Sequence, residues 1–359
     1  MTALHVVWAA TLLVQGADEK RLLYVASPGI RNYVEWGGKG ILVYDIDAGH
    51  RLLRRIESPF DDPDGKVENI KGLCASAATG RLWVSTIRRL ACLDLATEKW
   101  LWVKAYEGGC DRMSVSPDGK IVYLPSLEKD HWHAVDALSG EVLARLAPRN
   151  GAHNTVYGAD GKAVYLGGLK APILYVADPA RHEVAREVGP FSGAVRPFTV
   201  NRAQTRAYVC VNGLAGFEIG DLTTGKMIHR IEVPSPVKGP IKRHGCPSHG
   251  VGLTPDETQV WVVEAAAQAV HVYDNTVEPP RFVATIPLEV DQPGWVTFTI
   301  RGDLAYPSTG EVFDVKSRAR VAQLADEQGR PVQSEKMVEI DVAGGRVVRT
   351  GDQFGIGRK

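Results

Sequence analysis

Short apolar strands and turn residues alternate along nearly the whole chain, and one order of these elements recurs. A unit opens with an apolar strand and a turn such as Pro-Asp-Gly, and continues with a strand that carries an aromatic residue beside Val or Leu. A third strand ends in Asp, and a Thr-Gly or Ser-Gly turn leads to a last alternating strand. Alternation in short runs predicts β-strands, and Asp-Gly or Ser-Gly pairs favour tight hairpins. Because no stretch has a convincing helical period, we expect almost no helix.

Two sequence markers fix the register of the repeated unit, which is clearest at residues 111–148 and 249–288. The aromatic residues of the second strands recur at roughly 40–60 residues, the period of a propeller blade with loop insertions, and they are Tyr24, Trp83, Tyr123, Tyr165, Tyr208, Trp261 and Tyr306. The acids that end the third strands are Asp45, Asp94, Asp136, Asp178, Asp221, Asp274 and Asp314. Two markers that agree seven times predict an all-β fold, a seven-bladed β-propeller.

The first unit is incomplete, because no inner strand precedes Leu22. Residues 336–342 (KMVEIDV) form a leftover strand pattern near the C-terminus. An open ring would leave two exposed sheet edges, and such edges promote aggregation. We therefore expect the C-terminal strand to complete the first blade, so that residues 18–359 form one propeller.

The N-terminus has the pattern of a short secretory signal. Residues 4–14 are mostly apolar, Gly16 and Ala17 follow, and a charged run begins at Asp18. We expect residues 1–17 to be a signal peptide and the protein to be periplasmic or secreted. Since no Lys or Arg precedes the apolar run, an N-terminal strand or a start codon placed too late remains an alternative. The five cysteines are odd in number and lack a CxxC pair, so they do not indicate a compartment.

Charge and chain length bear on the possible partners of the protein and on its number of domains. Lys and Arg balance Asp and Glu at 42 each, so no global field attracts nucleic acid. No apolar run is long enough to span a bilayer as a helix. A chain of 359 residues would be long for a single core, but in a radial repeat each unit adds its own small core. We expect a monomer with no nucleic-acid partner and no membrane span.

Polar residues stand where the inner strands begin, the positions that line the channel mouth of a propeller. The candidate ligand-binding residues there are Lys71, Asp111, Arg112, Asn154, Arg196, Trp295 and Lys336, with Glu335 beside them. Arg and Lys bind carboxylates and phosphates, and Arg does so with two parallel hydrogen bonds. The sequence therefore predicts that an acidic small molecule or a protein partner binds at the mouth. Alternatively, these charges pair with one another around a solvated channel.

Candidate catalytic residues lie at the same positions. His153 or His249 could transfer a proton, with Glu264 at the end of a second strand orienting the imidazole. His131 and His133 lack a third metal ligand, and the run from His244 to His249 has fewer than the four ligands of a closed zinc site. We predict no metal site and assign no cofactor. No CxxCH motif occurs, which excludes covalent haem of the c type.

The repeats resemble the YVTN β-propeller family over nearly the whole chain after Lys20. The resemblance rests on the turns Pro117-Asp118-Gly119 and Pro255-Asp256, and on the strands at 208–211 (YVCV) and 261–264 (WVVE), where the tetrapeptide itself is degraded. It implies the fold but no single activity, since the superfamily includes lactonase-like proteins, lyases, haem and quinoprotein subunits, and binding modules. Three functions stay open: a binding propeller, a lactonase-like hydrolase or lyase, and a redox-partner subunit.

Overall fold

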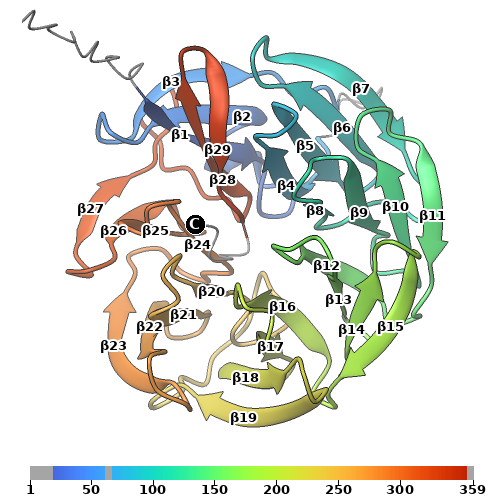
Figure 1. Ribbon diagram of the computed structural model, residues 1–359. Helices are drawn as coiled ribbons and strands as arrows, with labels where there is room; N and C mark the ends of the chain where they lie inside the picture. Colours follow the sequence, from blue (N-terminus) through green and yellow to red (C-terminus); the bar gives the residue numbers. More distant parts are fainter. Residues whose placement is uncertain (1–18, 61–66, 354–359) are drawn as a thin grey trace, which may run out of the picture.

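Seven antiparallel sheets stand around a central axis in the computed structural model, which describes residues 19–60 and 67–353 (Figure 1). Six sheets have four strands and one has five. The described residues contain no helix beyond a single 3-10 turn, η1 (Val34–Trp36). The prediction of an all-β, seven-bladed β-propeller is confirmed. The expected signal peptide, residues 1–17, lies outside the described residues.

The strands follow one another from the axis outward in the second to seventh blades. Blade two has β4 (Ile70–Ser76), β5 (Arg81–Thr86), β6 (Arg89–Asp94) and β7 (Lys99–Ala105). Blade three has β8 (Ser114–Val115), β9 (Ile121–Pro125), β10 (Trp132–Asp136) and β11 (Val142–Leu146). Blade four has β12 (Ala152–Tyr157), β13 (Val164–Gly168), β14 (Leu174–Asp178) and β15 (Glu183–Val188).

The remaining three blades repeat this order. Blade five has β16 (Val195–Val200), β17 (Arg206–Val211), β18 (Gly216–Asp221) and β19 (Lys226–Glu232). Blade six has β20 (Val251–Leu253), β21 (Gln259–Glu264), β22 (Ala269–Asp274) and β23 (Arg281–Pro287). Blade seven has β24 (Val296–Phe298), β25 (Leu304–Pro307), β26 (Glu311–Asp314) and β27 (Arg320–Gln323).

The first blade joins both ends of the described chain. It contains β1 (Lys20–Ser27), β2 (Gly40–Asp45), β3 (Arg51–Ile56), β28 (Met337–Ala343) and β29 (Arg346–Thr350). β28 pairs antiparallel with β1, which confirms that the C-terminal strand completes this blade. β29 is an additional strand, paired with β28, that the repeat pattern did not predict. The chain then crosses the inner strands, where the Gln353 side chain accepts a hydrogen bond from the Leu73 backbone N at 3.2 Å.

The two sequence markers have different physical roles. The second-strand aromatic residues are buried in the apolar layers that hold the strands and blades together. The third-strand acids shape the next hairpin: Asp136, for example, accepts a hydrogen bond from the Ser139 backbone N at 2.7 Å. Because both roles recur in every blade, the register read from the sequence holds around the ring, and it brings the starts of the inner strands to one face.

Candidate functional site at the channel mouth

A cavity of about 170 Å³ opens at the face where the inner strands begin. Its walls come from most of the ring, since successive blades contribute side chains that are far apart in the sequence. Six candidate residues from the sequence analysis line it: Lys71, Arg112, His153, Arg196, His249 and Lys336. The structure therefore brings these six together, as the repeat register requires.

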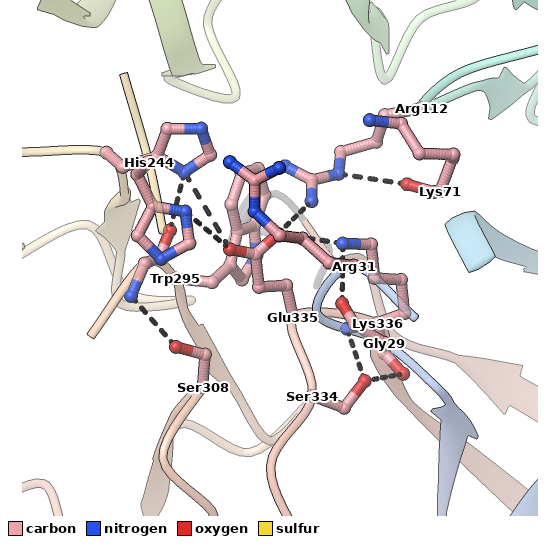
Figure 2. A network of polar contacts seen from close by, with 12 residues as sticks. Gly29, Arg31, Lys71, Arg112, His244, Trp295, Ser308, Ser334, Glu335 and Lys336 are labelled. Carbon is pink, nitrogen blue, oxygen red and sulfur yellow. Dashed lines mark hydrogen bonds and ion pairs between the residues drawn. The ribbon is translucent and has the colours of Figure 1, made fainter. Parts of the chain in front are cut away.

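Three further candidates lie directly behind the cavity wall. The Asp111 carboxylate is 2.7 Å from Nδ1 of His153 and 3.3 Å from Nζ of Lys71. The Trp295 ring lies under the Arg112 guanidinium, with 3.8 Å between the guanidinium carbon and the ring centroid (Figure 2). The backbone of Asn154 bridges to Arg112, and its buried side-chain amide has no hydrogen-bond partner within residues 19–60 and 67–353.

Glu264 does not take the role expected from the sequence. Its carboxylate accepts hydrogen bonds from Nε2 of His271 and from the Val237 backbone N, each at 2.8 Å. Glu264 and His271 occupy diagonal positions on neighbouring strands β21 and β22, which brings their side chains together. The expectation that Glu264 orients His153 or His249 is therefore corrected: Asp111 holds His153, and the backbone carbonyl of Gly294 holds Nδ1 of His249 at 2.9 Å.

Glu335 forms the centre of the charged groups at the mouth (Figure 2). Its Oε2 accepts hydrogen bonds from Nη2 of Arg112 at 2.6 Å and from Nζ of Lys336 at 2.7 Å, while Oε1 lies 3.2 Å from Nδ1 of His244. Burial alone would raise the pKa of Glu335, but Lys336, His244 and Arg112 together hold that pKa well below its usual range. Glu335 is therefore a buried carboxylate that stays ionised.

The two candidate histidines are neutral near pH 7. Burial lowers the pKa of His153, and it lowers the pKa of His249 well below its usual range. Because Nδ1 of each ring faces an acceptor, Nδ1 carries the proton and Nε2 keeps its lone pair. Both residues line the cavity, so each can accept a proton or a hydrogen bond from a molecule bound there.

Several buried polar atoms around the cavity lack a hydrogen-bond partner among the described residues. They are Nη1 of Arg112, Nε2 of His153, Nε2 of His244, Oε1 of Glu335, and both amide atoms of Asn154. Leaving such a group unsatisfied costs about 1–3 kcal/mol, and native proteins leave few of them without a protein, water or ligand partner. Arg112, His153, His244 and Glu335 line the cavity, so water or a bound ligand there can supply the missing partners.

Three basic groups of the cavity wall are not among the residues predicted from the sequence: Arg31, Arg243 and His244. Arg31 comes from the loop between β1 and β2, and no sequence signal marks it. Arg243 and His244 belong to the basic insertion before β20, whose run Lys242-Arg243-His244 was the available signal. Insertions have no register, so the repeat alignment cannot place their side chains.

Comparison with known proteins supports the fold alone. No family model and no curated protein matches the chain. Among solved structures, it is similar to hydrazine synthase from Kuenenia stuttgartiensis, with a TM-score of 0.59 and 15% identity over 72% of this chain and 79% of that one. At this identity the likeness establishes a shared β-propeller architecture and carries no statement about the site. What the comparisons and the geometry together establish is a seven-bladed β-propeller.

Proposed function

We propose that the protein is an extracytoplasmic β-propeller of the YVTN type that binds a small anionic molecule at its channel mouth. The charge of the residues that line the cavity supports this proposal, because six of them are basic and two are acidic. The basic residues are Arg31, Lys71, Arg112, Arg196, Arg243 and Lys336, and the acids are Glu128 and Glu335. Burial lowers the pKa of Lys336 to about 7, so the five others carry the positive charge at higher pH. A cavity wall with an excess of one charge concentrates small ligands of the opposite charge.

Arg112 is the observation that carries the proposal. Its side chain is only 3% exposed, and Nη2 binds Glu335 while Nη1 has no partner among the described residues. The ring of Trp295 fixes the guanidinium plane from one side. A preoriented guanidinium nitrogen at a cavity is suited to bind a carboxylate or phosphate oxygen. The cavity of about 170 Å³ has room for a small molecule.

Isothermal titration calorimetry on protein dialysed against EDTA tests this proposal, with inorganic phosphate and small mono- and dicarboxylates as ligands. We expect binding of one anion per chain, and a loss of at least about tenfold in affinity in Arg112→Gln, because a charge-assisted hydrogen bond is worth about 1.5–3 kcal/mol. Arg281→Gln is the matched control, since Arg281 lies 73% exposed on the outer strand β23. No binding of any anion, or equal affinities in the two variants, contradicts the proposal.

A lactonase-like hydrolase or lyase is the second candidate, and the Asp111–His153 pair favours it. A carboxylate 2.7 Å from Nδ1 fixes the imidazole tautomer, so Nε2 is the unprotonated nitrogen that can act as a general base. We expect His153→Gln to lower kcat/KM by about 10²–10⁴-fold on whichever lactone or unsaturated acid is turned over. His182→Gln, in a turn outside the cavity, serves as the control. Unchanged turnover in His153→Gln removes this residue from the mechanism.

The extracytoplasmic location rests on the N-terminal sequence pattern. We expect the exported chain to begin close to Asp18, after cleavage behind Ala17. Intact-mass measurement of the protein from periplasmic and cytoplasmic fractions tests this. Recovery of the uncleaved chain only from the cytoplasm contradicts it.

A further inference from the structure

His244, His249 and Glu335 bring three metal-ligating side chains together at one edge of the cavity. One potential ligand atom from each residue lies within 4.8 Å of the others. Nδ1 of His244 is 3.2 Å from Oε1 of Glu335, and Nδ1 of His249 is 3.9 Å from the same oxygen. The two imidazole rings stack with 4.5 Å between their centroids. Bonds of about 2.0–2.2 Å to a shared ion need ligand atoms about 3–4 Å apart. Ligation through Nδ1 of His249 therefore releases the proton of that nitrogen and replaces its hydrogen bond to the Gly294 carbonyl.

All three side chains are withdrawn from solvent. The side chains of His244 and Glu335 are each 5% exposed, and that of His249 is 8% exposed. Oε1 of Glu335 has no hydrogen-bond partner among the described residues, and it is the oxygen that faces both imidazoles. The other oxygen, Oε2, is fixed by Arg112 and Lys336. A carboxylate with one oxygen held by neighbouring donors and the other open is the arrangement that orients a ligand toward a metal.

Two imidazoles and one carboxylate are the ligand set of an open metal site. A structural zinc site needs four protein ligands, whereas sites that bind a further molecule keep three and leave one position open. Imidazole nitrogen selects zinc and other first-row transition metals over Ca²⁺ and Mg²⁺, which prefer oxygen ligands. The open position here faces the cavity that all three residues line.

We propose that His244, His249 and Glu335 bind one divalent first-row transition ion, such as Zn²⁺, with its open coordination position toward the mouth cavity. The neighbouring Arg112 guanidinium lowers the affinity of the site for a bare dication and raises it for a dication that carries an anion. The metal and the small anion of the proposed function therefore increase each other's affinity, as linkage requires.

Direct metal binding tests this inference without any activity assay. Protein freed of metal with EDTA, then dialysed into buffer without phosphate or carboxylate, is titrated with Zn²⁺ by calorimetry and with Co²⁺ by visible absorption. We expect one ion per chain and the visible bands of a four-coordinate Co²⁺ site. His244→Ala and His249→Ala should each weaken the binding of Zn²⁺ and Co²⁺. The loss should exceed the roughly 10–100-fold that follows when a residue that only supports a metal ligand is replaced.

His229→Gln is the matched control, because His229 pairs with Glu278 at 3.5 Å on the outer surface without a second imidazole. Circular dichroism and thermal unfolding establish that each variant is folded. Absence of stoichiometric binding, or undiminished binding in both His244→Ala and His249→Ala, overturns the inference. The outcome is separable from the proposed function: anion binding is measured without metal, and metal binding is measured without the anion.

Discussion

Two charge clusters of this propeller are each built around a buried arginine and a buried glutamate, but they differ in how completely they are paired. The seam cluster, between blades one and seven, consists of Arg21, Asp47, Asp303 and Glu339. The mouth cluster consists of Arg112, His244, His249, Glu335 and Lys336. The central arginine of each is 3% exposed and binds a buried glutamate, at 2.9 Å for Arg21 with Glu339 and 2.6 Å for Arg112 with Glu335.

The seam cluster is complete within the protein. Nε of Arg21 binds Glu339, while Nη1 and Nη2 bind Asp303 at 2.9 and 2.7 Å. In the mouth cluster, Nη1 of Arg112, Nε2 of His244 and Oε1 of Glu335 have no hydrogen-bond partner among the described residues. Buried charge by itself therefore does not separate a structural network from a binding site. Open, preoriented donors and acceptors beside a cavity do, because the fold alone gains nothing from leaving them unpaired.

Removal of Arg21 should have the largest effect on stability. Burial raises the pKa of Glu339 to about 7, so the test is made above that pH, where Arg21→Met leaves a buried carboxylate without its cation. Breaking a buried pair in this way costs about 3–5 kcal/mol. Urea unfolding followed by circular dichroism measures the change, and anion binding below the unfolding transition should be unchanged. A loss of stability no larger than that of an exposed control such as Arg281→Gln would show that the seam cluster does not hold the ring together.

His50, beside the seam cluster, should give stability a pH dependence. Burial and then the charge of Arg21 lower the pKa of His50 from 6.5 to about 4, and its Nε2 lies 2.9 Å from the Tyr306 hydroxyl. Between these two pH values the unfolded chain takes up a proton that the folded protein does not. Stability should therefore fall as the pH drops from 6.5 to about 4, by at most about 3 kcal/mol from this group.

His50→Asn should flatten that pH dependence, and Asn tolerates the positive φ of 61° at this position. His182→Asn is a close control, because His182 also has a positive φ, 53°, and contacts a tyrosine hydroxyl, that of Tyr123. Urea unfolding at several pH values between 4 and 7 measures both variants. An unchanged acid dependence in His50→Asn would assign the effect to other groups.

Removal of Arg112 should have the smallest effect on stability. In Arg112→Met, Glu335 keeps its hydrogen bond from Lys336, so we expect a loss near the lower end for one charge-assisted hydrogen bond, about 1.5 kcal/mol. The same variant should lose anion binding, which reverses the pattern expected for Arg21→Met. Equal losses of stability in the two variants, with anion binding retained in Arg112→Met, would remove the distinction between the clusters.

The repeat register explains why most of the mouth was predictable from the sequence. Residues that begin an inner strand, such as Lys71, Arg112 and His249, are placed by the two markers of their blade. Glu264 was wrongly expected to orient a channel histidine. A side chain at the end of a second strand can contact its diagonal neighbour on the third strand, here His271, as readily as it can point into the channel. Arg31 and His244 lie in loops and could not be placed. The open atoms were not predictable at all, since an unpaired atom is defined only when every neighbour is known.

One measurement addresses the mouth cluster most directly: a high-resolution crystal structure of the protein soaked with inorganic phosphate or a small dicarboxylate. We predict density for one anion in the cavity, within hydrogen-bond distance of Nη1 of Arg112, with Trp295 still under the guanidinium. Ordered waters that satisfy Arg112, His153 and Glu335 at saturating anion concentration, with no anion in the cavity, would contradict this account.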